Sequence, residues 1–412
     1  MPVAALLICL LLPPELSVHL GGLKLSGYRV LLLIMFLPML YQLMLAPALK
    51  TTPADWCMCF VSAWSFVALV ANHTVIEAIE KGGILIVEML GAYLVARVYI
   101  RSYAQLQAVA FLMVCITALV LIVSIPESLS GVHFLRGSNI TIYPERFGLH
   151  RAYGPFDHPI LHGVVCAAAF SYAYYLLADN ISGTLNRLFP LFIVCAATFF
   201  ALSAGPYIAL ATQIGLVIWD RLSKNFKGRW WFVIVTIVSI YIALDIASNR
   251  SPVAVLISYL SFSGQTAYMR LLIFDFGSAE VLRHPLLGIG FNEWVRPGWM
   301  PPSVDNFWLL TAMRYGLPTL LGIVAVMAYM VIRIGSRDTH SELLRNAGRA
   351  WGFTLAGFVL VGCTVHFWNA TFILFFFLLG SGCWLLEYKD APEQVPGKYL
   401  SRPLWPVRST LF

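Results

Sequence analysis

The chain is divided into long runs of apolar residues by short groups of charged residues, glycines and prolines. A helix that crosses the bilayer core needs about 20 apolar residues, and about twelve such runs fit along this chain. With 59% hydrophobic and 11% charged residues, the sequence excludes a water-soluble multidomain enzyme, since soluble chains carry roughly 25% charged residues. We therefore expect an all-α integral membrane protein with a single domain over residues 1–412. The expected membrane helices lie near residues 3–20, 28–46, 54–72, 83–100, 104–125, 159–178, 187–203, 206–220, 230–246, 305–333, 350–367 and 369–387.

Basic residues predict how these helices are oriented, because short cytoplasmic loops are enriched in Lys and Arg. If twelve helices alternate, one side collects the basic groups, and we assign it, with both chain ends, to the cytoplasm. The run at 1–12 has no basic start and no small-residue cleavage site, so we interpret it as a retained first helix. The basic groups are Lys50, Arg97, Arg101, Arg187, Arg221, Lys224, Lys227, Arg229, Arg333, Arg337, Arg345, Arg349, Lys389, Lys398, Arg402 and Arg408.

Two long segments, 126–158 and 247–304, then face the outside, and neither contains a lysine. A planar guanidinium binds two phosphate oxygens at once, whereas an ammonium acts as a point charge. Arginine without lysine therefore indicates a phosphate site in these segments. The alternative is that the arginines pair with acidic residues of the same segments, such as Glu127, Glu145 and Glu280. The seven arginines are Arg136, Arg146, Arg151, Arg250, Arg270, Arg283 and Arg296.

The second outer segment is predicted to contain a helix. Ala267–Leu282 is rich in Leu, Ile and Phe with charged residues interspersed, which is typical of a helix at a membrane surface. A turn at His284-Pro285 follows, with glycines and tryptophans after it.

Three motifs occur in order on the predicted outer side. The first is Arg151-Ala-Tyr-Gly-Pro-Phe-Asp-His-Pro159. The second starts at Arg270 and ends in His284-Pro-Leu-Leu-Gly-Ile-Gly290, and the third is Asp305-Asn306, nine residues, then Gly316-Leu-Pro-Thr319. In this order and placement they resemble the O-antigen ligase and Wzy-type polymerase superfamily of bacterial envelope glycosyltransferases. The resemblance covers most of the chain.

This resemblance implies a GT-C-like fold in the bacterial inner membrane, with an active site that faces the periplasm. It implies a glycan donor on undecaprenyl diphosphate and an acceptor hydroxyl on a second glycan or on lipid A core, with no metal, cofactor or nucleotide sugar. The ligase motif is His, then Asn, Ser or Gln, nine residues, Gly, two residues, and Gly, Thr or Tyr. Asn306, Gly316 and Thr319 match this pattern, and Asp305 occupies the histidine position.

Transfer of a glycan from a diphosphate needs a base for the attacking hydroxyl and positive charge for the leaving phosphate. Arg151 and Arg270 match the family's motif arginines and are the first candidates for the diphosphate contacts. Arg146 and Arg136 are second candidates because they precede Arg151 closely. Asp305, just before an apolar run, is either the general base or the cap of the following helix.

Other polar residues nearby are candidate substrate contacts. His158 and His162 are alternative bases, as are His150 and His284, and Asn306 lies beside the candidate base. Arg314 lies nine residues into the tenth run, roughly 13 Å along a helix. A charge there lines a cavity or pairs with another polar group, for which His366 and Asn369 are candidates.

We therefore expect an inverting, metal-independent glycosyltransferase, and the replacement of the motif histidine by Asp305 favours a polymerase over a ligase. The net charge of +7 follows from loop orientation and predicts no nucleic-acid partner. The alternative is a transporter or flippase of lipid-linked glycans, for which related halves and midplane sites would be expected. A structural membrane subunit is a third possibility, but it would leave the outward arginines without a role.

Overall fold

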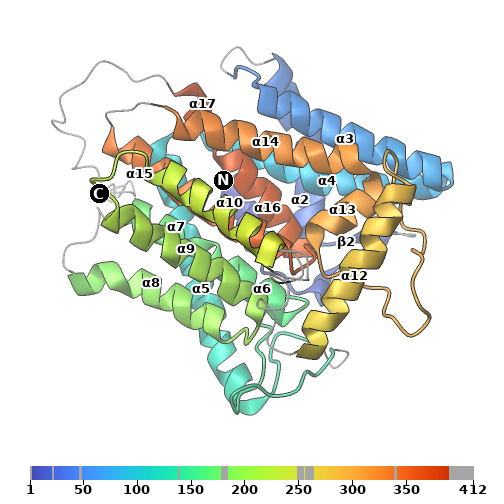
Figure 1. Cartoon of the computed structure of the whole chain (residues 1–412), viewed down its shortest axis with the longest axis horizontal. Helices are drawn as coiled ribbons and strands as arrows, with labels where there is room; N and C mark the ends of the chain where they lie inside the picture. The colour runs from blue at the N-terminus through green and yellow to red at the C-terminus, as the bar shows by residue number, and fades with distance from the viewer. Residues whose placement is uncertain are drawn as a thin grey trace, which may run out of the picture.

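The computed structural model describes residues 2–20, 23–45, 49–137, 140–177, 184–247, 255, 264–337 and 341–388. Within these ranges the fold is helical apart from the antiparallel hairpin of β1 (Val18–Leu20) and β2 (Leu23–Leu25). The helices are α1 (Pro2–Cys9), the 3-10 turn η1 (Pro14–Leu16), α2 (Gly27–Leu45), α3 (Pro53–Asn72), α4 (Val75–Tyr99), α5 (Tyr103–Ser130), α6 (Pro159–Ala167), α7 (Ala169–Tyr172), the π-helical η2 (Ala173–Leu177), α8 (Thr184–Phe199), α9 (Ala204–Leu222), α10 (Arg229–Ala247), α12 (Gly264–Arg283), α13 (Phe307–Tyr315), α14 (Leu317–Gly335), α15 (Glu342–Gly362), α16 (Asn369–Ser381) and α17 (Cys383–Glu387) (Figure 1).

Eight helical segments in the described chain are long and apolar enough to cross a membrane. They are α2, α3, α4, α5, the continuous segment Pro159–Leu177, α10, α14 and the segment Asn369–Glu387. The protein is therefore an all-α membrane protein, as the sequence predicts. The helix expected over Ala267–Leu282 is also confirmed, as α12.

The prediction of a first membrane helix over 3–20 is wrong. Helix α1 contains 8 residues, which reach only about 12 Å at 1.5 Å per residue, whereas the hydrocarbon core is about 30 Å thick. Pro13 and Pro14 follow the helix, and a proline lacks the amide hydrogen that a continuing helix needs. The chain turns at η1 and forms the β1–β2 hairpin instead.

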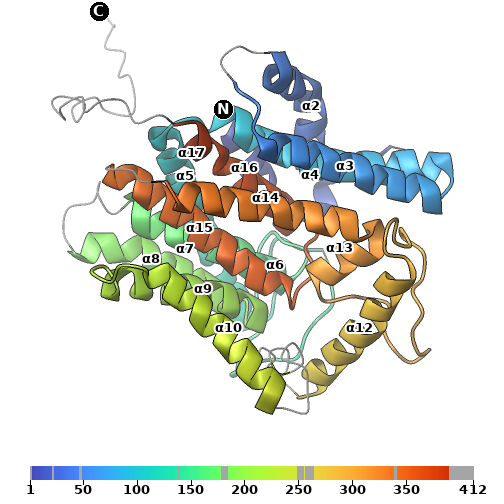
Figure 2. The ribbon, with the colours of Figure 1, turned by 45° about the horizontal axis from the view of Figure 1, so that its top comes forward.

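The single helix predicted over 305–333 is also wrong. The chain forms two helices there, α13 and α14, separated at Gly316, which has a positive φ of 81°. This conformation is open to glycine and strained for other residues. In Figure 2, α13 lies between α12, at one corner of the molecule, and the long α14.

Close backbone contacts hold the centre of the bundle together. Helix α16 lies in the middle and packs on α4 at Gly380, where a Cβ atom would stand 2.3 Å from the carbonyl oxygen of Tyr93. At Gly163 of α6, a Cβ would meet Ala201 and Pro206 at 2.5 and 2.6 Å. Small residues allow helices in membranes to approach closely, so these two glycines set the spacing of the central helices.

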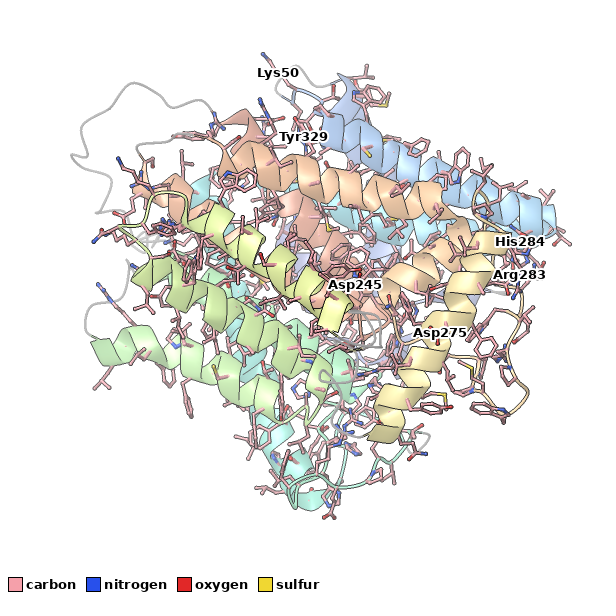
Figure 3. All side chains as sticks on the ribbon, in the orientation of Figure 1. Lys50, Asp245, Asp275, Arg283, His284 and Tyr329 are labelled. Carbon is pink, nitrogen blue, oxygen red and sulfur yellow. The ribbon has the colours of Figure 1, made fainter. Side chains whose placement is uncertain are left out.

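Basic residues predicted on the cytoplasmic side gather at one end of the bundle. Asp220 of α9 forms ion pairs with Arg229 at 3.0 Å and with Arg349 at 3.3 Å. Arg97 donates a hydrogen bond to the carbonyl of Lys50 and pairs with Glu387. In Figure 3, Lys50 lies near the top of the molecule, away from the end of α12 at the right-hand side.

We predict that the end of the bundle that carries these contacts faces the cytoplasm. A cysteine at the exposed Phe134 should react with a membrane-impermeant thiol reagent added outside intact cells. A cysteine at the exposed Leu343 should react only after the membrane is opened. Labelling of both positions from the same side would contradict the orientation and the outward placement of the candidate site.

Candidate active site

Arg151 lies on the loop that leads into α6, and the residue is only 7% exposed. Its Nε donates to the carbonyl of Ala201 at 3.4 Å, and its guanidinium lies 4.6 Å from the ring centroid of Tyr143. Burial, together with the positive charge of Arg146, lowers the pKa of Arg151 to about 10. The guanidinium therefore remains charged near neutral pH although it has lost most of its water.

In the described part of the chain, no carboxylate lies within 4.0 Å of Arg151. A buried charge without a partner is unfavourable unless another group compensates it. Arg146 adds a second positive charge at the same place, because its side chain donates to the carbonyl of Leu202 at 2.6 Å. The two arginines therefore create a position that favours an anion.

The loop around Arg151 is fixed by the end of α5. The buried carboxylate of Glu127 accepts hydrogen bonds from the amides of Tyr153 and Gly154 at 2.9 and 2.8 Å. Ser128 donates to the carbonyl of His150 at 2.7 Å. Glu127, which the sequence offers as an arginine partner, instead holds the backbone of the first motif in place.

His158 caps α6 and is not available as a base. Its Nδ1 accepts the amide hydrogen of Ile160 at 3.0 Å, and its Nε2 lies 2.8 Å from the hydroxyl of Tyr143. Burial, together with the charge of Arg151, lowers the pKa of His158 to about 3. The imidazole is therefore neutral, and both of its nitrogens are used within the protein, where the ring positions Tyr143 beside Arg151. The sequence predicts a substrate contact for His158, and the structure gives it this supporting contact instead.

Two further predicted substrate contacts are used inside the protein. His162 is completely buried, and its ring nitrogens lie 3.2 Å from the hydroxyl of Ser124 and 2.9 Å from the carbonyl of Ala152. Arg136 pairs with Glu15 at 2.8 Å and lies 3.7 Å from Asp157. The structure thus assigns both side chains to packing and loop anchoring.

Arg270 of α12 and Asp305 lie near each other although 35 residues separate them in the sequence. Asp305 is exposed at the surface, yet dense protein around it displaces water and raises the pKa of its carboxyl, which the charge of Arg270 partly offsets. Desolvation lowers the pKa of the half-buried Arg270, and Asp305 opposes that shift. Within the described chain no ion pair of 4.0 Å or less joins the two side chains.

Asn306, and not Asp305, caps α13. The Asn306 Oδ1 accepts the amide hydrogen of Leu309 at 2.9 Å, and its Nδ2 donates to the carbonyl of Cys363 at 3.0 Å. The sequence leaves capping and catalysis open for Asp305, and the structure gives the cap to its neighbour. The Asp305 carboxylate is consequently available for chemistry, whereas the amide of Asn306, predicted to contact substrate, is already used.

The second and third motifs are joined through their backbones. The amides of Ile289 and Gly290 donate to the carbonyls of Met313 and Arg314 at 2.8 and 2.9 Å. The amide of Leu317 donates to the carbonyl of Pro285 at 2.7 Å. The glycines of the His284–Gly290 turn thus let it dock against the break between α13 and α14.

Arg314 lies in the last turn of α13, at this break, and not deep within a membrane helix. Its guanidinium lies 4.9 Å from the ring centroid of Phe291. Burial and the charge of Arg314 lower the pKa of His366 to about 3, which places His366 near Arg314 as the sequence suggests. Asn369, the other suggested partner, instead donates to Asp157 at 2.7 Å.

Gly316→Ala should strongly destabilise this junction. An added Cβ would lie 1.9 Å from the carbonyl oxygen of Leu286, in a backbone conformation with φ of 81°. We expect a loss of about 1–3 kcal/mol, measured as thermal unfolding of the detergent-purified protein. Gly335→Ala, at the last residue of α14, is the matched control, since a Cβ there meets no atom within 4 Å. Equal stability of the two variants would contradict the importance of the Gly316 contact.

The remaining outward arginines follow the alternative interpretation. Arg283 pairs with Glu280 at 2.8 Å, and Arg296 pairs with Glu293. Arg250 lies outside the described residues. Ion pairs therefore account for three of the seven arginines, since Arg136 also pairs with acidic residues. Arg151 and Arg270 are the arginines that the three motifs single out.

The segment 363–368, between α15 and α16, links the two parts of the site. The amide of Phe307 donates to the carbonyl of Val365 at 3.1 Å, which anchors this segment beside Asp305. The ring of Trp368 lies 5.7 Å from that of His158 and 5.6 Å from that of His366. The sequence does not predict the positions of Trp368 and Tyr143 at the site, because an aromatic residue near an apolar run has the same signature in a site as in core packing.

Comparison with models of known protein families and with curated protein sequences finds no match for this chain.

Proposed function

We propose that this protein is a membrane glycosyltransferase that moves a glycan from undecaprenyl diphosphate to an acceptor hydroxyl at the periplasmic face of the bacterial inner membrane. The observation that carries the proposal is Arg151, a buried and charged guanidinium without a carboxylate partner in the described chain, beside Arg146. Such a position favours a multiply charged anion, and a diphosphate is the anion that this reaction releases. An all-helical membrane fold is also what a GT-C-like enzyme requires.

The proposed reaction is a single displacement. The acceptor hydroxyl oxygen forms a bond to the anomeric carbon as the bond from that carbon to the diphosphate oxygen breaks. The proton of the hydroxyl passes to Asp305, whose raised pKa makes it a stronger base than an ordinary aspartate. Arg151 and Arg270 stabilise the negative charge that develops on the diphosphate. Attack opposite the leaving group inverts the anomeric centre.

The acceptor distinguishes a polymerase from a ligase. We favour a polymerase, in which the acceptor hydroxyl belongs to a second lipid-linked glycan, because aspartate stands at the ligase histidine position. Incubation of the purified protein with an undecaprenyl-diphosphate-linked repeat unit tests this directly. A ladder of longer glycans supports the polymerase, whereas product that forms only when lipid A core is added supports the ligase.

A transporter of lipid-linked glycans is the second candidate, and one observation favours it. The discontinuous pair α13 and α14, broken at Gly316, is the kind of interrupted helix that lines binding sites in transporters. Proteoliposomes loaded with a lipid-linked glycan separate the two functions. A new glycosidic bond supports the transferase, whereas movement of unchanged glycan lipid across the bilayer supports the transporter.

Glycan transfer should proceed without a divalent metal, because the proposed mechanism uses arginines to stabilise the leaving diphosphate. Activity on the purified lipid-linked glycan should remain within about twofold of the untreated enzyme in excess EDTA, a change below 0.5 kcal/mol. A loss that magnesium or manganese restores would contradict the arginine-based mechanism. A nucleotide-sugar transferase that depends on manganese, assayed in parallel, verifies that the chelator is effective.

A further inference from the structure

A polar cleft opens between the β1–β2 hairpin, the start of α2, the first motif and the start of α16. Its polar lining comes from Lys24, Tyr28, Arg29, Asp157 and Asn369. These residues come from three separate stretches of chain, 24–29, 157 and 369. The cleft is therefore a product of the fold, and the mechanism proposed above does not use it.

An apolar hollow adjoins this cleft. It is lined by side chains from α1 and the residues after it, α5, α6 and α16, including Leu7, Leu11, Met113 and Val165. Leu10 lines both spaces, so the two meet at that side chain.

The two spaces lie at different depths along the same helices. Asn369, at the start of α16, lines the polar cleft, whereas Leu374 lines the apolar hollow roughly 7 Å further along the helix. Asp157 lines the cleft just before α6, and Val165 lines the hollow roughly 9 Å beyond the first residue of that helix. A polar end and an apolar end are thus arranged along one direction, which is the shape of an amphiphile.

The charges of the cleft indicate which polar head fits. Lys24 is exposed, and Arg29 is held in place by Glu88 at 2.6 Å and by the carbonyl of Lys24 at 2.6 Å. Lys24 offers a charge-assisted hydrogen bond to a phosphate oxygen, and Arg29, whose charge Glu88 partly offsets, adds a second donor. On the other side, Asp157 and Asn369 are joined at 2.7 Å and present oxygen and amide groups to hydroxyls.

We propose that the cleft and the hollow together form a lipid-binding site for a phosphate-bearing lipid. The phosphate lies at Lys24 and Arg29, hydroxyl groups of the head face Asp157 and Asn369, and the chain enters the hollow between α1, α5 and α6. A phospholipid of the membrane and a polyprenyl phosphate share this chemistry. The site is separate from the diphosphate position at Arg151 and does not depend on the proposed transferase activity.

Native mass spectrometry of the full-length protein in detergent tests the proposal, with phosphatidylglycerol and undecaprenyl phosphate titrated in separate experiments. Lys24→Glu removes the exposed cation, and Leu11→Trp fills the apolar hollow. Lys24→Glu should weaken binding by about tenfold, the scale of one lost charge-assisted hydrogen bond. Leu11→Trp should weaken binding by about as much, because the larger ring occupies the space of the lipid chain. The matched control is Leu119→Trp, which puts the same bulky residue on a 59% exposed position of α5 and should leave binding unchanged.

The response of the two lipids identifies the occupant. If the two variants bind only phosphatidylglycerol more weakly, the site belongs to membrane phospholipid. If they bind only undecaprenyl phosphate more weakly, it belongs to a polyprenyl lipid. The proposal would be overturned if both variants bind both lipids as tightly as the Leu119→Trp control does. A loss confined to only one of Lys24→Glu and Leu11→Trp would also overturn it, since head and chain must both contribute. Glycosyltransferase activity is not the readout, so failure of the proposed function leaves this test intact.

Discussion

Arg151→Lys should lower glycan transfer nearly as much as Arg151→Ala, by about 10²–10³ in turnover, the scale for removing one preorganised donor. Lysine keeps the positive charge but loses the planar pair of donors that binds two phosphate oxygens. The same result is expected for Arg270→Lys and Arg270→Ala. The measurement is the initial rate of product formation from a purified lipid-linked glycan in detergent.

Arg283→Lys is the matched control on the same helix as Arg270. Arg283 is partly exposed and pairs with the buried Glu280 at 2.8 Å, and lysine keeps the positive charge beside that carboxylate, so the rate should stay near that of the unmodified protein. Lysine variants of Arg151 and Arg270 that keep most of the activity would show that charge alone suffices. That result would remove the forked diphosphate contact from the mechanism.

Asp305→Asn should abolish turnover while the protein still folds and binds the donor. The amide cannot accept the proton of the attacking hydroxyl, and a positioned general base contributes about 10²–10⁴ in rate. Stability should not change, because the cap of α13 is the side chain of Asn306, whose Oδ1 lies 2.9 Å from the amide of Leu309. Asp305→His, which restores the ligase-type residue, should retain activity.

Asn306→Ala is the control that separates the two roles. It removes the cap and should cost about 0.5–2 kcal/mol of stability, measured as a lower thermal unfolding temperature. Its effect on turnover should be smaller than that of Asp305→Asn. An active Asp305→Asn enzyme would exclude Asp305 as the base.

The pH dependence of the reaction follows from the same carboxyl. The base acts in its ionised form, so activity is present above the pKa of Asp305 and is lost as the pH falls through it. Because loss of water raises this pKa, the acid limb of kcat/KM should lie above the usual value of about 3.9 for aspartate. In Asp305→His the acid limb should move up to the range of histidine, about 6.5.

Much of the fold could be predicted from the pattern of apolar runs, because bilayer thickness requires long apolar helices. Two helices were mispredicted for local reasons. In the run at 3–20 the apolar character continues past Pro13, although the helix cannot, and in the run at 305–333 a single glycine conformation breaks the helix. Apolar periodicity reports where side chains are buried and is insensitive to such a break.

The candidate site could be predicted only in part. Arginine without lysine and the motif order point to Arg151 and Arg270, and the structure places Arg270 near Asp305. The role of His158 could not be predicted, because a histidine before a helix has the same sequence signature whether its Nδ1 caps the helix or its ring contacts a substrate. The tertiary contact of Tyr143 with Arg151 decides between these roles.

The backbone bonds between the His284–Gly290 turn and the α13–α14 break determine which parts of the site can move independently. Arg270 is on the helix that leads into this turn, and Asp305 directly precedes α13, so both belong to one hydrogen-bonded unit. Arg151 is held by α5 through Glu127 and belongs to another. Substitutions of Arg270 and Asp305 should therefore act non-additively. Relative motion of the two units would instead change the distance between Asp305, the proposed base, and Arg151.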